Sequence, residues 1–231
     1  LQESGMENFS IDLIYGVPGF DDESWRKNLE IAFSLGVPHL SAYALTVEEG
    51  TPLHWMTNRG KAKPVDEEAQ ANQFRLLMKM AADHGYEHYE ISNFAKPGRY
   101  ALHNTNYWRG EKYLGLGPSA HSYNGDARRW NVSNLTRYLA AIESGILPYE
   151  EEILTPVQQF NEYVMTSIRT QWGCATGWIA RRFGEEFARE LLRQAARFEV
   201  NGYLRNDNGL IRLTDEGKLL ADGITAQLFS A

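Results

Sequence analysis

The sequence predicts an α/β domain with parallel strands at the front of the chain, followed by a smaller, mainly helical, winged-helix-like domain. Short apolar runs alternate with amphipathic segments through about residue 100. Helical patterns dominate after Asn131, and a hairpin pattern follows them. We therefore expect two domains, at residues 1–131 and 132–231.

The first domain is expected to alternate strand, helix, strand, helix and strand. The run FSIDLIYG at 9–16 is nearly continuously apolar, which is typical of a strand buried on both faces. DDESWRKNLEIAFSLG at 21–36 has acidic residues in its first turn and a terminal Gly36, which predict a helix. Strands at 39–46 and 88–95 flank a second helix at about 66–84, and this order predicts parallel pairing.

Two strand–helix units are too few to close a barrel. The opening LQESG lacks an initiator Met and resembles the end of a helix that stops at Gly5. We therefore expect that these 231 residues are the later part of a longer chain.

The second domain is expected to contain helices at roughly 133–144, 156–170, 176–182 and 185–199. The segment 202–214 predicts a hairpin with an Asn-Asp-Asn-Gly turn, and a last helix is expected at 215–228. Glu150 to Glu152 is interpreted as a solvated linker and 172–177 as a turn. Winged helices often bind DNA, but the acidic balance of this chain favours a packing module.

Composition excludes several classes of function. The 23 basic and 30 acidic residues give a net charge of −7, which argues against a nucleic-acid binder. No apolar stretch reaches the roughly 18–20 residues of a membrane span, and no signal peptide is apparent. The single Cys174 excludes an internal disulfide and a multi-cysteine metal site built from this chain alone. These features predict a cytoplasmic protein.

Asp12 interrupts the first predicted strand, where an unpaired buried carboxylate would cost several kcal/mol. Either a neighbouring backbone group satisfies it, or it faces the interior and accepts hydrogen bonds from the hydroxyls of a ligand. Glu48 and Glu49 follow the second strand, and we interpret them as solvated loop charges rather than acid–base groups.

The segment HNTNYW, 103–108, has no helical period and is expected to be a loop. A lone histidine is more often structural than a ligand. His103 beside Tyr107 and Trp108 would nevertheless suit a flat aromatic ligand, with the imidazole on an iron and the aromatic rings against a macrocycle. His121 is also expected in a loop flanked by aromatic residues.

GLGPSA, 115–120, nominally matches the G-x-G-x-x-A dinucleotide fingerprint. We reject that interpretation because Pro118 precedes a turn, whereas the motif needs a helix that opens on a phosphate. The glycines are expected instead to let the backbone approach a ligand or a neighbouring strand.

Taken together, SIDLIYGVPG, HLSAYALTVEEGTPL, GYEHYEISNFAKPG, HNTNYW and YLGLGPSAHSY resemble the HemW-type radical S-adenosylmethionine family, which is related to oxygen-independent coproporphyrinogen III oxidase. The resemblance runs from near Met6 to Tyr123 and continues more loosely beyond. It implies the last strands of a partial (β/α)6 barrel that holds S-adenosylmethionine and a [4Fe–4S] cluster, followed by a helical HemN-type C-terminal domain.

The resemblance also implies roles for individual residues. Asp12 matches the acidic S-adenosylmethionine contact of the family. Thr46 and His121 align with two further positions around that cofactor in the oxidases, although the residue types differ.

HNTNYW looks like the family's His-Asn-x-x-Tyr-Trp motif, which is implicated in haem handling. His103 would then be the haem-iron ligand candidate. Asn104, Tyr107 and Trp108 would shape the haem site.

By this resemblance the protein is expected to bind haem and deliver it to haem-dependent respiratory proteins. The alternative is oxidative decarboxylation of coproporphyrinogen III to protoporphyrinogen IX in haem biosynthesis, and a winged-helix adaptor is a third. The family's cysteine triplet would lie upstream of Leu1, so this chain alone should have no radical chemistry, and it is assigned no catalytic residue. Peripheral membrane association and the oligomeric state stay open.

Overall fold

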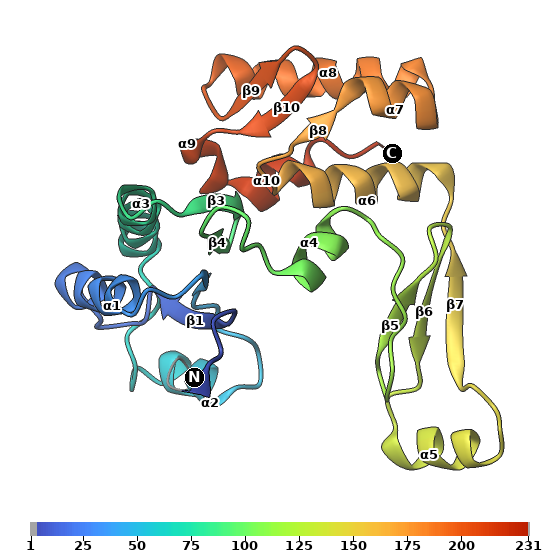
Figure 1. Ribbon diagram of the computed structural model, residues 1–231, viewed down its shortest axis with the longest axis horizontal. Helices are drawn as coiled ribbons and strands as arrows, with labels where there is room; N and C mark the ends of the chain where they lie inside the picture. Colours follow the sequence, from blue (N-terminus) through green and yellow to red (C-terminus); the bar gives the residue numbers. More distant parts are fainter. Residues whose placement is uncertain (1–3, 231) are drawn as a thin grey trace. The chain divides into compact units, whose positions relative to one another are not determined.

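The computed structural model describes residues 4–230, which form two compact units, one ending at Ala101 and one beginning at Leu102 (Figure 1). The helix end predicted before Gly5 involves residues 1–3, which lie outside the described residues. The domain boundary predicted at 131/132 falls inside the second unit. It lies there because strand β6 (Ala127–Asn131) pairs with β7 (Tyr149–Ile153) across that point.

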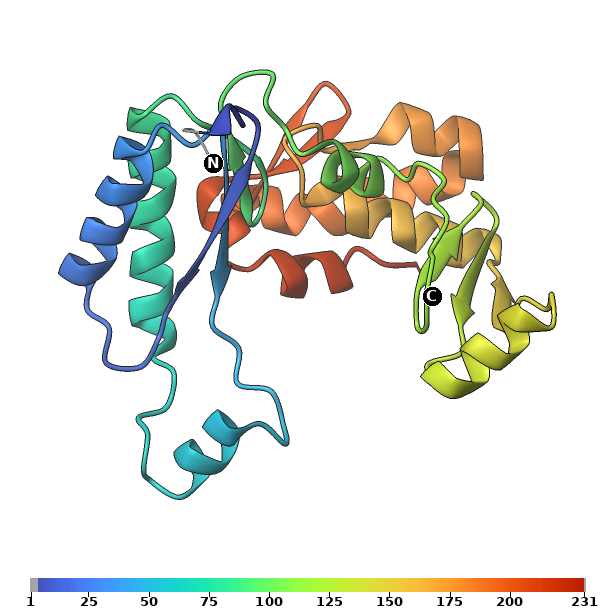
Figure 2. The same cartoon turned by 60° about the horizontal axis from the view of Figure 1, so that its bottom comes forward.

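The first unit is a four-stranded sheet with three helices. The strand order is β1-β2-β4-β3. The elements are β1 (Ser10–Tyr15), α1 (Asp22–Ser34), β2 (His39–Ala44), α2 (Pro52–Asn58), α3 (Glu67–Asp83), β3 (Glu87–Glu90) and β4 (Asn93–Ala95). The helices α1 and α3 lie side by side in Figure 2, and their apolar faces bury Trp25, Leu29, Phe74 and Leu77.

The parallel pairing of β1 with β2 is confirmed, but the single third strand predicted at 88–95 is wrong. That segment is two strands, and β4 runs antiparallel to both β2 and β3. The buried Glu90 carboxylate accepts hydrogen bonds from the Ser92 amide at 3.0 Å and from Asn93 Nδ2 at 2.6 Å. These two bonds stabilise a tight reversal within the predicted strand.

The prediction that β1 is buried on both faces is also wrong. Its side chains alternate, with Ser10, Asp12 and Ile14 exposed. In the described sheet β1 is the edge strand, and its burial alternates as in a sheet covered on one face only. The Asp12 carboxylate is therefore exposed rather than buried.

Gln73 of α3 stabilises the loop that follows β1. Its side-chain oxygen accepts a hydrogen bond from the Gly16 amide at 2.8 Å, and its nitrogen donates to the Phe20 carbonyl at 3.0 Å and to Asp22 at 3.2 Å. The side chain is 1% exposed. Removing it would leave a buried amide without a partner, which is costly.

The second unit contains two three-stranded sheets, with orders β5-β6-β7 and β8-β10-β9. The remaining elements are α4 (Leu102–Trp108), β5 (His121–Tyr123), α5 (Leu135–Glu143), α6 (Pro156–Ile168), β8 (Cys174–Ala175), α7 (Thr176–Phe183), α8 (Glu185–Val200), β9 (Leu204–Asp207), β10 (Leu210–Leu213), α9 (Asp215–Lys218) and α10 (Ala221–Ala226).

The predicted helices at α5 to α8 and the hairpin β9–β10 are confirmed. Asn208 and Gly209 form the hairpin turn, and both have positive φ, 54° and 87°, as a type I′ turn requires. The predicted helix 215–228 is interrupted because Leu220 leaves the helical conformation, with φ −116° and ψ 19°.

Two segments predicted to be irregular are strands. Glu150 to Glu152 lie in β7 because β6 presents complementary side chains: Arg129 pairs with Glu151 at 2.6 Å, and Trp130 Nε1 donates to Glu150 at 3.1 Å. Within 172–177, β8 pairs with β10.

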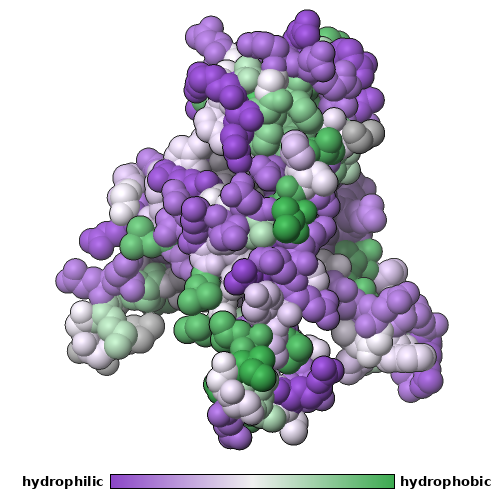
Figure 3. Space-filling model, turned by 90° about the vertical axis from the view of Figure 1, so that its right-hand side faces the viewer, coloured by the Kyte–Doolittle hydropathy of each residue, from purple (hydrophilic) through white to green (hydrophobic). Residues whose placement is uncertain are grey.

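The helix α5 has no buried residue. Leu135, Leu139 and Ile142 on this helix and Ile146 beyond it are exposed, and Figure 3 shows hydrophobic side chains gathered over this lobe.

Replacing Gln73 by Met, which has a similar length but no amide, should lower the free energy of unfolding by roughly 1–3 kcal/mol. Urea unfolding followed by circular dichroism measures the change. Asn72→Ala, on the exposed side of the same helix, is the matched control and should shift stability by less than about 0.5 kcal/mol. Equal stability of the Gln73→Met variant and the parent chain would contradict this role.

Candidate functional site

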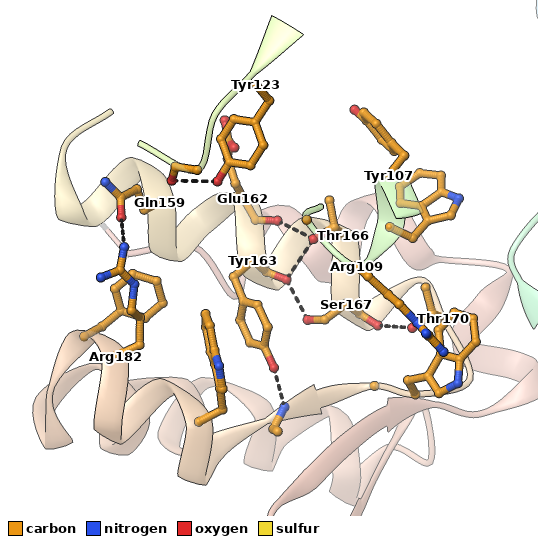
Figure 4. Close-up of a pocket in the computed structure, with 18 of the residues that line it drawn as sticks. Tyr107, Arg109, Tyr123, Gln159, Glu162, Tyr163, Thr166, Ser167, Thr170 and Arg182 are labelled. Carbon is orange, nitrogen blue, oxygen red and sulfur yellow. Dashed lines mark hydrogen bonds between the residues drawn. The ribbon is translucent and has the colours of Figure 1, made fainter. Parts of the chain in front are cut away.

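The helix α6 has a buried apolar side and a half-buried side of different chemistry. Phe160, Val164 and Ile168, at i, i+4 and i+8, lie in the apolar core of the second unit. Tyr163 and Thr166 belong to another face, which forms one wall of a cavity (Figure 4). One helix therefore both holds the unit together and positions cavity side chains.

The cavity has a volume of about 460 Å³, within the usual range of small-molecule sites. Its walls come from the end of α4, the β5–β6 hairpin, α6, β8 and α7. Aromatic side chains dominate these walls: Tyr107, Trp108, Tyr113, Tyr123, Tyr163, Trp172, Trp178 and Phe183. Flat apolar surfaces of this kind suit a planar ligand.

Tyr163 and Trp178 form a rigid part of the wall. Their rings stack with centroids 4.1 Å apart, and the Tyr163 hydroxyl accepts a hydrogen bond from the Ala175 amide at 3.1 Å. Burial raises the pKa of Tyr163 to about 12. The phenol is therefore neutral at physiological pH.

The charges of the cavity are mostly positive, although the chain as a whole is acidic. Arg109, Arg128 and Arg182 line it, and Glu162 is its one acidic residue. Arg128 pairs with Glu162 at 2.7 Å. Burial raises the pKa of Glu162, and this effect exceeds the opposing attraction of Arg128. An anionic group on a ligand would be attracted to this site.

The structure places the HNTNYW motif on the helix α4, so the predicted loop is wrong. Tyr107 and Trp108 line the cavity. His103 is exposed and lies one helical turn before Tyr107 on the same face, and neither His103 nor Asn104 lines the cavity.

The other predicted ligand residues lie in both units. Asp12 is exposed on the β1–β2 face that also carries His39, and Thr46 is exposed just beyond β2. His39 is buried and bonded to Ser10 through Nδ1 at 2.7 Å and to a tyrosine hydroxyl through Nε2 at 2.7 Å. Its pKa is lowered by burial, an effect that Asp12 opposes. His121 is exposed on β5 of the second unit rather than in a loop.

Of the two glycines in GLGPSA, Gly115 allows the predicted close approach to a neighbouring strand, whereas a Cβ on Gly117 would meet no atom within 4 Å. A Cβ on Gly115 would lie 2.2 Å from the His121 carbonyl oxygen. No helix begins after this segment, which leads into β5. The rejection of a dinucleotide site is therefore consistent with the fold.

The chain's own residues do not fit an iron–sulfur cluster. Within residues 4–230, no group of three or more His, Cys, Asp or Glu side chains is arranged to hold a metal ion. The single Cys174 is buried, and burial raises the pKa of its thiol to about 12. Cluster iron needs thiolates, which this chain cannot supply in sufficient number.

Sequence reasoning missed most of the cavity wall, notably Arg109, Tyr163, Trp172 and Trp178. The sequence pattern that could have indicated part of this wall lies on α6. There Gln159, Tyr163 and Thr166 recur at helical spacing on a different face from the apolar positions.

Known proteins resemble the chain in sequence. The HemN C-terminal domain model matches residues 154–220. The haem chaperone HemW of Bacillus subtilis is 32% identical over 96% of this chain, and that of Mycobacterium tuberculosis H37Rv is 33% identical over 97%. Over most of its own length the chain is therefore similar to HemW haem chaperones. It spans 59% and 56% of the lengths of these two HemW proteins.

A solved structure supports the same fold. Coproporphyrinogen III oxidase HemN from Escherichia coli, a radical SAM enzyme, superposes with a TM-score of 0.75 at 23% identity. The match covers 99% of this chain and 56% of HemN. This chain thus has the mixed α/β fold of HemN over almost its whole length. Among the residues that the structure describes, no helix has the length and apolar character to cross a membrane.

Cys174 should resist alkylation by iodoacetamide at pH 8 in the folded protein, because its raised pKa keeps the thiol protonated and burial blocks access. The rate in the folded protein should stay far below that of an exposed thiol and should not level off near pH 9, because the thiol titrates only near 12. Mass spectrometry reports the modification. The urea-unfolded chain is the control and should react completely. Comparable rates for the folded and unfolded chains would disprove this assignment.

Proposed function

We propose that this chain is the C-terminal part of a HemW-type protein and that it binds haem in the cavity beside α4. The observation that carries the proposal is the combination of aromatic walls with an excess of arginine in a chain of net charge −7. Haem is a planar, largely apolar macrocycle with two carboxylates, so its chemistry matches both features. The similarity to HemW haem chaperones supports the same ligand.

In the proposed complex the macrocycle packs between the α4 aromatics and the Tyr163–Trp178 stack. Tyr107 and Trp108 connect the HNTNYW motif to the cavity. His103, one turn before Tyr107 on α4, is the proposed iron ligand at the rim, and Asn104 is proposed to help shape it.

We further propose that the parent protein delivers haem to respiratory proteins in the cytoplasm. In that protein, β1 and β2 would belong to a partial (β/α)6 barrel, and residues 132–231 would form a winged-helix-like domain. Asp12, Thr46 and His121 would contact S-adenosylmethionine. The exposed Asp12 carboxylate fits this role because it is free to accept hydrogen bonds from ribose hydroxyls. The cluster would need cysteines from another part of the protein.

The alternative function is oxygen-independent oxidation of coproporphyrinogen III, which the structural similarity to HemN favours. A fold shared with an enzyme does not establish its reaction. The cysteine-bearing parent protein, reconstituted with cluster and S-adenosylmethionine, would decarboxylate coproporphyrinogen III under this alternative and would not under the haem-chaperone proposal.

Replacing His103 by Ala should weaken haem binding by about tenfold or more, equivalent to ~1.4 kcal/mol or above, because an iron ligand is lost. Absorbance titration would show a shifted Soret band and a higher Kd. His54→Ala is the matched control, since His54 also lies beside a tryptophan on a seven-residue helix. Unchanged affinity and an unchanged Soret band in the His103→Ala variant would refute the ligand assignment.

Replacing Asp12 by Asn in a full-length protein that includes this segment should weaken S-adenosylmethionine binding by about tenfold, because a charged acceptor forms stronger hydrogen bonds than an amide. Calorimetric titration measures the affinity. Asp83→Asn, at the exposed end of α3, is the control and should bind as the parent does. Parental affinity of the Asp12→Asn variant would exclude the contact.

A further inference from the structure

Arg109 differs from the other two arginines of the cavity. Its guanidinium lies over the Trp172 ring, 4.4 Å from the centroid. In the part of the chain that the structure describes, no carboxylate pairs with it. Figure 4 shows the side chain extending toward Thr170. Arg109 therefore presents an uncompensated positive charge to a ligand.

The other two arginines are already partnered. Arg128 forms the 2.7 Å ion pair with Glu162. Arg182 donates to Gln159 at 3.0 Å and lies 3.6 Å from Asp126. Arg128 Nε is buried without a hydrogen-bond partner, but a carboxylate already offsets the charge of each of these two guanidiniums. A ligand carboxylate would therefore gain more from the charge of Arg109.

We infer that Arg109 binds a carboxylate of the cavity's ligand and so sets which edge of the ligand enters at the Trp172 side. The ligand class is a planar tetrapyrrole with ionised carboxylate side chains. This inference rests on the proposed function, which places such a ligand in this cavity.

The stacking on Trp172 explains why an arginine suits this position. A guanidinium stacked on an aromatic ring keeps the N–H groups at its edge free, so it can still bind a carboxylate through two parallel hydrogen bonds. The ring also limits the orientations of a long side chain, which lowers the entropy lost on binding. A lysine would keep the charge but lose both the stacking plane and the two-pronged geometry.

Glu162 contributes to the same orientation from the other side of the cavity. Its carboxylate offsets the charge of Arg128 and would repel a ligand carboxylate placed beside it. The electrostatic gradient between the two sites therefore directs the ligand's carboxylate edge toward Arg109. The less polar edge would lie toward β5 and β6, where Tyr123 contributes to the wall.

The experiment compares haem with haem dimethyl ester, whose carboxylates are blocked, in titrations of the whole 231-residue chain. The parent chain should bind haem about tenfold or more tightly than the ester. Arg109→Met should remove this preference by weakening haem binding while leaving the affinity for the ester unchanged. Arg109→Lys should recover only part of the preference.

Arg59→Met is the matched control, because Arg59 lies over the Trp55 ring, at 5.8 Å, in the first unit and outside the cavity. It should keep the full preference for haem. Circular dichroism would verify that both variants fold, as expected for exposed side chains.

Two results would overturn the inference: equal weakening of haem and ester by Arg109→Met, which indicates a structural role, or a preference that persists in this variant. Glu162→Gln gives an independent test and should tighten haem binding, because it frees the charge of Arg128. Failure of the proposed function has a different signature, since the parent chain would then bind neither haem nor the ester saturably.

Discussion

The second unit depends on the packing of α6, which is buried on one side and lines the cavity with another. Phe160, Val164 and Ile168 exclude water from one side of this helix and pack it into the core. This packing fixes the rotation of the helix about its axis, and Tyr163 and Thr166 therefore face the cavity. The position of Tyr163 is in turn fixed by Trp178 and by the Ala175 amide. The packing of the core therefore also sets the positions of the cavity side chains on α6.

The charge distribution adds a second constraint. Three arginines line one small cavity and would repel one another without compensation. Glu162 and Asp126 offset two of them, while the third lies on an aromatic face. Burial raises the pKa of Glu162, so the ionised form of this partly desolvated carboxylate is disfavoured there. A charge arrangement of this kind is expected at a binding site, where the ligand supplies the missing anion.

Elements with strong local signals could be predicted from the sequence. The helix α1 begins after Asp21, whose carboxylate accepts the Ser24 amide at 2.8 Å, and the hairpin turn at Asn208 and Gly209 follows from local chemistry. Elements that depend on distant partners could not. The acidic strand β7 forms because Arg129 lies opposite Glu151, and α4 has no apolar period because one side of it is open.

The cavity could not be predicted for the same reason, since residues from 107 to 183 meet only in the folded chain. Of the residues that line the cavity, the HNTNYW motif predicts only Tyr107 and Trp108 as parts of a ligand site.

The most direct test of the haem site is a crystal structure of the chain with one equivalent of haem. We expect a macrocycle in the cavity, against the Tyr163 and Trp178 rings, with a carboxylate on Arg109 and His103 within reach of the iron. Haem bound elsewhere, with the cavity between α4 and α6 free of it, would contradict the account.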